Sequence, residues 1–135
     1  MTTASVPTGN GASDHDEIVR VVHLYTDAFG ADDVGMFEAA FHDDAWIFYT
    51  DAEGTLVKGL IKDCFEGWAE PAMGRADGRI ISVTQAGDIA SVLVGWDRPD
   101  DMANSYVDLH NLIRLVGQWK ITNKTATHSS RAGGA

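Results

Sequence analysis

The strongest constraint on the fold is a change in the spacing of apolar residues about halfway along the chain. In the first part they recur at helical intervals, as in Ile18, Val21, Val22, Tyr25 and Phe29, a spacing that predicts an amphipathic helix. After residue 78 the apolar residues form longer stretches separated by turn residues, which predicts strands. Helices followed by a meander of antiparallel strands indicate the α+β class.

Local signals set the expected limits of these elements. Asp14 can cap the first helix with Glu17 as its capping-box partner, and Gly30 suits its end. A second helix is expected from about Asp33, with Asp32 or Asp33 as its cap and Val34, Phe37 and Phe41 on one face. A third carries the apolar stripe from residue 60 to residue 68. Strands are expected at residues 45–50, 55–57, 79–85, 89–97, 105–115 and 118–127.

The composition describes one domain, at residues 14–127, with flexible tails at residues 1–13 and 128–135. No internal repeat is visible. The residues expected to be buried are Ile18, Val21, Val22, Phe29, Phe37, Phe41, Phe65, Leu109 and Ile113.

Acidic residues dominate the chain, with 20 acids against 10 bases and a net charge of −10. This balance argues against nucleic acids and anionic membranes as partners. Cys64 is the only cysteine, which excludes an internal disulfide and a multi-cysteine metal site and favours the cytoplasm. We see no phosphate loop, nucleophile elbow or metal motif, so no cofactor and no metal are expected. Neither a signal peptide nor a membrane span is expected.

The strand at residues 105–115 suggests a binding site. Alternation separates Val107, Leu109, Asn111, Ile113 and Leu115 from Tyr106, Asp108, His110, Leu112 and Arg114. If the first row faces the core, Asn111 is a buried amide that needs a partner. A two-residue turn at residues 116–117 places Lys120 and Lys124 on the same face.

These polar groups and an apolar wall predict a pocket lined by Tyr25, Tyr49, Trp68, Asn111 and Lys124. Equally, Asn111 can be satisfied by the backbone while a bulge turns the lysines to solvent. If the register differs by one, Asp108, His110 and Arg114 form the inner row.

The second row is expected on the outer face of the sheet. This face would hold His110, Leu112, Trp119 and Ile121, which is too apolar to be exposed to water. We therefore expect a homodimer formed across the outer sheet face.

Several short segments resemble the nuclear-transport-factor-2-like superfamily. They are residues 25–33 (YTDAFGADD), 41–45 (FHDDA), Gly59, 86–90 (AGDIA) and 117–124 (GQWKITNK). The nearest resemblance is to the branch called putative lumazine-binding, close to the SnoaL-like cyclases. The resemblance implies a cone, in which a curved antiparallel sheet wraps around three helices, and a frequent dimer through the outer sheet face.

Members of this superfamily include enzymes as well as binding proteins. In ketosteroid isomerase-like members, the resemblance matches Tyr25 to a functional tyrosine, places the catalytic base at Tyr49 and places a second acid near Asn111. Tyrosine is a poor proton acceptor at neutral pH because its ordinary pKa is about 10. Two hypotheses follow. In the first, the protein binds a small molecule and has no assigned specific function. In the second, it is an enzyme of the isomerase, dehydratase or polyketide-cyclase type that uses acid–base chemistry in the cone.

Overall fold

Two helices begin the fold because each has a capping residue and an apolar face. In α1 (Asp14–Ala28) the cap is Ser13, whose side chain accepts a hydrogen bond from the Asp16 amide, rather than Asp14 as predicted. In α2 (Val34–Ala40) it is Asp33, one of the two predicted caps, whose side chain accepts a hydrogen bond from the Gly35 amide. Gly30 lies just after α1 with a φ of 69°, a left-handed conformation that favours glycine. The computed structural model describes residues 13–73, 77–97 and 106–128, so nearly all of both predicted tails lies outside the described residues.

The third helical segment is shorter than predicted and is split. A 3₁₀ turn, η1 (Ile61–Cys64), leads into α3 (Phe65–Ala69), and a second turn, η2 (Pro71–Met73), follows. The strands are β1 (Phe41–Thr50), β2 (Leu56–Leu60), β3 (Asp77–Ala86), β4 (Ile89–Asp97), β5 (Tyr106–Leu115) and β6 (Gln118–His128). The segment around Phe41, predicted as the end of the second helix, thus begins β1.

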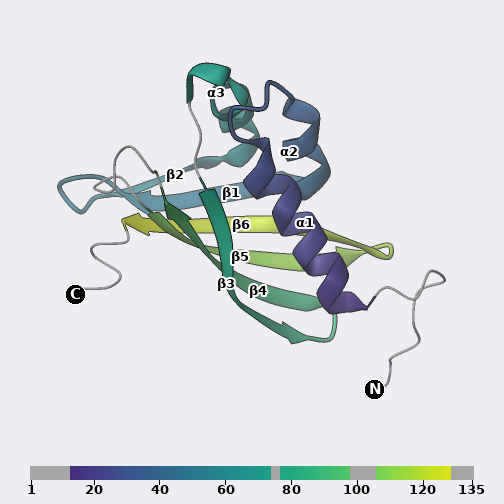
Figure 1. The fold of residues 1–135 in the computed structure, drawn as a ribbon. Coiled ribbons are helices and arrows are strands. Elements are labelled where there is room, and N and C mark those ends of the chain that lie inside the picture. Colours follow the sequence, from purple (N-terminus) through teal and green to yellow (C-terminus); the bar gives the residue numbers. More distant parts are fainter. Residues whose placement is uncertain (1–12, 74–76, 98–105, 129–135) are drawn as a thin grey trace.

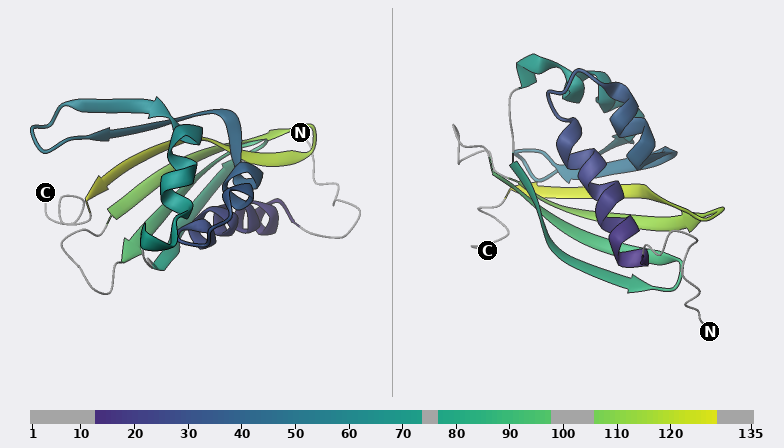
Figure 2. Two further views of the ribbon diagram at one scale, coloured as in Figure 1. Left: turned by 90° about the horizontal axis from the view of Figure 1, so that it is seen from above. Right: turned by 45° about the vertical axis from the view of Figure 1, so that its right-hand side comes forward.

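The six strands form one sheet in the order β2-β1-β6-β5-β4-β3. All neighbouring pairs are antiparallel except β1 and β6, which are parallel. The sheet is strongly curved, and α1 crosses its concave face while α2 and α3 stand over the β1 side (Figure 1). Figure 2 shows the same wrapping from above and from the side. The predicted α+β cone is confirmed.

The core lies between the concave face and the helices. Of the residues predicted to be buried, six are at most 5% exposed: Ile18, Val21, Val22, Phe37, Phe41 and Phe65. Phe29 is partly buried against the same core. Leu109 was predicted wrongly, because it is 42% exposed, and Ile113 is only partly buried.

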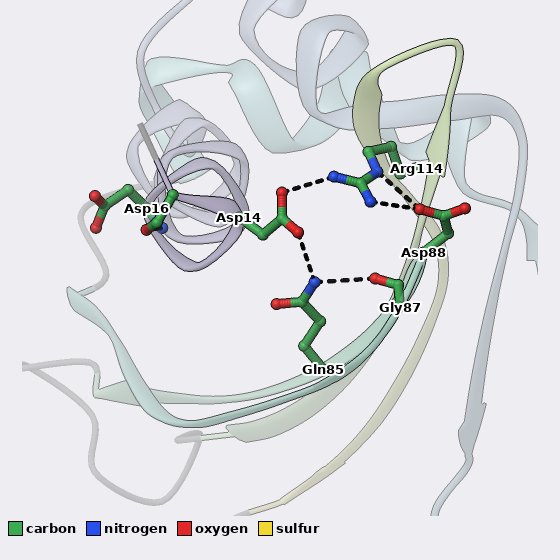
Figure 3. Close-up of polar contacts among 7 residues, drawn as sticks. Asp14, Asp16, Gln85, Gly87, Asp88 and Arg114 are labelled. Atoms are coloured by element: carbon green, nitrogen blue, oxygen red, sulfur yellow. Dashed lines mark hydrogen bonds and ion pairs between the residues drawn. The ribbon is translucent and has the colours of Figure 1, made fainter. Parts of the chain in front are cut away.

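An ionic network fastens the first turn of α1 to the sheet. Arg114 on β5 donates to Asp14 at 2.6 Å and to Asp88 at 2.8 Å. Gln85 donates to the other oxygen of Asp14 and to the carbonyl of Gly87, both at 2.9 Å (Figure 3). This network joins α1, the β3–β4 turn and the end of β5.

Candidate functional site

The row of β5 that faces the core is the one predicted to face outward. Asp108, His110 and Leu112 are at most 2% exposed, whereas Leu109 and Asn111 are exposed. The side chain of Asn111 hydrogen-bonds Ser91 and Asn123 on the convex face. The prediction that Asn111 faces the interior was therefore wrong, and the one-residue alternative named above is the observed arrangement.

A β-bulge explains why Lys124 nevertheless faces inward. The turn at residues 116–117 pairs Leu115 with Gln118, as predicted, and the register holds as far as Leu112 and Ile121. The next pair is Asn111 with Asn123, so Thr122 is an extra residue. Because one extra residue reverses the alternation beyond it, Lys124 joins Ile121 on the concave face and lies opposite His110.

Asp108 is the centre of the buried polar cluster inside the cone. Its Oδ2 accepts hydrogen bonds from the Tyr25 hydroxyl at 2.8 Å and from Trp96 Nε1 at 2.7 Å. The ammonium nitrogen of Lys124 is 3.6 Å from the same oxygen, and Nε2 of His110 is 3.7 Å away. We call these five residues the Asp108 cluster.

Electrostatics keep Asp108 ionised. Burial alone would raise the pKa of this carboxyl group, but Lys124, His110 and the Tyr25 hydroxyl together outweigh it and hold the pKa well below its usual range. Burial and the charge of Asp108 raise the pKa of Tyr25 well above 10.0. The cluster therefore contains a carboxylate, an ammonium and a phenol that keeps its proton.

Three aromatic rings lie around Lys124, from α1, from the residue that follows α1, and from α3. Its ammonium nitrogen lies 4.3 Å from the ring centre of Trp68, 5.3 Å from that of Tyr25 and 6.0 Å from that of Phe29. A cation at such distances from aromatic faces is stabilised by the ring quadrupoles. Lys124 is only 7% exposed, and its positive charge is stabilised inside the protein by one carboxylate and three aromatic rings.

His110 differs from the other members of the cluster. It is 0% exposed, and neither Nδ1 nor Nε2 has a hydrogen-bond partner. Burial lowers its pKa, an effect that the nearby Asp108 only partly offsets, so the imidazole is neutral at pH 7. A neutral imidazole has one donor and one acceptor; Nε2 lies 3.7 Å from Asp108 Oδ2, too far for a hydrogen bond, and Nδ1 has no hydrogen-bond partner either.

The structure brings together three of the five predicted pocket residues. Tyr25 and Trp68 have ring centres 6.3 Å apart, and both contact Lys124. Tyr49 follows Ile47 on the concave side of β1, but it is 41% exposed beyond the cluster. Asn111 is on the opposite face of the sheet.

Three residues of the cluster were not among the predicted pocket residues. Two of them were left out because the predicted register of β5 placed them on the outer face, and the third was not considered as a site residue. Asp108 and His110 appeared only in the one-residue alternative. Trp96 was treated as an ordinary strand residue, although an indole at the end of an apolar strand often needs an acceptor when it is buried.

Comparison with known proteins agrees with this architecture. The sequence profile of the family described as "Putative lumazine-binding" matches residues 13–126. The chain belongs to this family. The cone is the fold of small-molecule-binding proteins of this kind, and no specific function is assigned to the family.

Solved structures show the same fold. An NTF2-like protein of unknown function from Shewanella baltica OS155 is 24% identical with a TM-score of 0.74, and the match covers 84% of this chain and 92% of that one. One from Methylobacillus flagellatus KT is 27% identical with a TM-score of 0.71, covering 90% and 97%. A domain with a cystatin-like fold from Nostoc punctiforme PCC 73102 is 19% identical, with a TM-score of 0.63 and coverage of 87% and 79%. A search of curated proteins gives no significant match.

Two further properties concern metals and membranes. Among the described residues, no three His, Cys, Asp or Glu side chains gather closely enough to hold a metal ion. Within the same part of the chain, no helix has the length and apolar character needed to cross a membrane.

Cys64 is a free, partly buried thiol whose pKa is raised by burial.

Proposed function

We propose that this protein binds a flat, partly polar small molecule inside the cone, next to the Asp108 cluster. The observation that carries the proposal is His110, whose two ring nitrogens are buried without a partner. Leaving a buried polar group unsatisfied costs about 1–3 kcal/mol. A ligand with a polar group that reaches one of these nitrogens would satisfy it and recover part of this cost.

The surroundings of His110 support a flat ligand. Trp68 and Phe29 are only partly buried, and they present aromatic surface on which a planar ring can stack. Lys124 adds a positive charge that can approach a carbonyl oxygen. The family description makes lumazine, a planar heterocycle with ring N–H groups and carbonyl oxygens, the first probe to test.

Binding fits the cluster better than acid–base catalysis does. A carboxylate with a depressed pKa is a weak base, and a phenol with a raised pKa is a weak acid at neutral pH. The alternative function, an isomerase, dehydratase or polyketide cyclase, would therefore have to use His110 within the Asp108 cluster, although burial lowers the pKa of this imidazole as well.

Titration with lumazine, followed by tryptophan fluorescence, tests the proposal. Trp68 and Trp96 lie at the site, so we expect a saturable change in emission. The His110→Phe variant should bind about tenfold more weakly, since leaving one buried polar group of the ligand unpaired costs about 1–3 kcal/mol and about 1.4 kcal/mol corresponds to tenfold. The matched variant His23→Phe, at an exposed position of α1, should bind like the wild type. Equal binding by His110→Phe would reject the site.

The dimer across the outer sheet face remains part of this proposal, with different residues. The four residues first expected there, His110, Leu112, Trp119 and Ile121, are at most 4% exposed and face the core. The convex face instead carries the exposed side chains of Trp46, Ile81 and Leu109 around the polar ladder of Ser91, Asn111 and Asn123. An isologous contact over this face would cover the apolar side chains, with about 1,000 Å² or more buried in total.

Sedimentation at micromolar concentrations tests the dimer. The wild type should sediment at twice the mass of the chain, and Leu109→Glu should shift it to the monomer because a charge would be buried at the centre of the contact. Val116→Glu, at the exposed turn between β5 and β6, is the matched control. A monomeric wild type would reject the dimer.

Within the same proposal, the free thiol of Cys64 supports a reducing cytoplasmic location.

A further inference from the structure

A second concave site lies outside the cone, where the helices meet the start of β1. It is a groove of about 720 Å³ lined by residues of α2, β1, η1, α3 and β6. Its volume is within the range of small-molecule sites, about 300–1,000 Å³. None of its lining residues belongs to the Asp108 cluster. Phe41 lies between the two, since it is a lining residue of the groove and its ring centre is 6.3 Å from that of His110.

The floor of the groove is apolar and firmly packed. Val34, Phe41 and Phe65 contribute to it. The ring centre of Phe65 is 5.3 Å from that of Phe37 in a stacked pair and 5.7 Å from that of Phe41. Because these rings are fixed by the core, the floor is already formed without a ligand.

The rim carries more negative than positive charge. Lys62 pairs with Asp43 at 3.3 Å, and the ammonium of Lys120 donates to the carbonyl of Ala39 at 2.7 Å. Asp43 thus balances the charge of Lys62, whereas a neutral carbonyl leaves the charge of Lys120 in place, so four carboxylates of the groove stand against two ammonium groups. Within the described part of the chain, the rim carboxylates Glu38, Asp63 and Glu66 form no ion pair or side-chain hydrogen bond.

We propose that this groove binds an aliphatic polyamine, with its methylene chain on the phenylalanine floor and its ammonium groups at the unpaired carboxylates. Charge complementarity selects this class of ligand. The net negative rim would repel an anion, and a neutral molecule would gain no attraction from the three exposed, unpaired carboxylates. These carboxylates come from α2, η1 and α3, so a chain with several separated ammonium groups matches them better than a single cation does.

Calorimetric titration of the full chain with spermidine tests this inference. The buffer should contain about 150 mM salt, because the Debye length of about 8 Å then screens non-specific attraction to the acidic surface. We expect one saturable site. The double variant Glu38→Gln/Glu66→Gln should raise the Kd for spermidine about tenfold or more. The control Asp27→Asn/Glu53→Gln removes the same charge at exposed positions outside the groove. Its Kd for spermidine should differ from that of the wild type by less than about twofold.

Three outcomes would overturn the proposal. One is the absence of saturable heat with spermidine, and another is an equal loss in the two double variants, which would indicate attraction to net charge alone. The third is binding of a lysine-rich peptide at these carboxylates without binding of spermidine, which would make the groove a protein-docking surface. Binding of spermidine to His110→Phe should be unchanged, so a failure of the lumazine site and a failure of the groove are separable.

Discussion

Replacing His110 by phenylalanine should make the unliganded protein more stable. The imidazole is 0% exposed and has two unpartnered nitrogens, and each buried unsatisfied group costs about 1–3 kcal/mol. Phenylalanine keeps a planar ring but adds volume and removes the attraction of the imidazole to Asp108, and both changes offset part of the gain. We expect a net increase in the free energy of unfolding of about 1–2 kcal/mol. For a domain of this size, that raises the Tm by about 4–8 °C.

The pH dependence provides a second measure of the same substitution. Burial lowers the pKa of His110 in the folded protein, so below the unfolded pKa of about 6.5 the unfolded chain binds a proton that the folded chain resists. The wild type therefore loses stability as the pH falls through this region, by at most about 1.4 kcal/mol per pH unit from this group. The gain from His110→Phe should grow correspondingly below about pH 6.5.

Urea denaturation followed by far-UV circular dichroism, at about pH 8 and about pH 5.5, measures both effects. His23→Phe is the control, because His23 is exposed on α1. The reasoning would be refuted if His110→Phe were less stable than the wild type at both pH values. It would also be refuted if the variant and the wild type lost the same free energy of unfolding between about pH 8 and about pH 5.5, since folding would then not lower the pKa of His110.

Other substitutions test the rest of the interior. Tyr25→Phe should lower the free energy of unfolding by about 1.5–3 kcal/mol in urea denaturation, because Asp108 loses a hydrogen bond to a charged acceptor; an unchanged value would contradict this. Lys124→Met should cost about 3 kcal/mol by leaving a buried carboxylate unpaired, and adding Asp108→Asn should recover part of the loss, whereas additive losses would exclude the pair. Gly78→Ala should lower stability by about 1–3 kcal/mol in thermal denaturation, since its Cβ would lie 2.9 Å from a side-chain methyl group of α1. Gly59→Ala, with nothing within 4 Å of the added atom, should change stability by less than about 1 kcal/mol, and an equal effect of the two would contradict the steric argument.

The architecture was predictable because local signals and apolar spacing agree along most of the chain. The cap at Asp33, the turn at residues 116–117 and the limits of β4 were all found from residue type and periodicity. Helix 3 was overestimated since a helical stripe does not distinguish a continuous helix from a 3₁₀ turn followed by one short turn of α-helix.

The face of β5 could not be decided from its own residues. Both rows contain apolar and polar side chains, and the row with Leu109 and Asn111 is the less charged of the two. Asp108 faces inward because Tyr25, Trp96 and Lys124 satisfy it there, and these partners lie far from it in the sequence. Lys124 reaches the interior only through the bulge at residue 122, for which the sequence carries no clear signal.

The most direct test of the cone site is a long-range ¹H–¹⁵N spectrum of the histidine side chains at neutral pH, recorded with and without lumazine. It reports the protonation and hydrogen bonding of each imidazole. Without lumazine, His110 should be neutral, with ring nitrogens that resemble unbonded ones. Saturating lumazine should shift the resonances of His110 and leave those of His23 unchanged. A charged His110 at neutral pH, or His110 resonances that lumazine does not move, would contradict a ligand site at the Asp108 cluster.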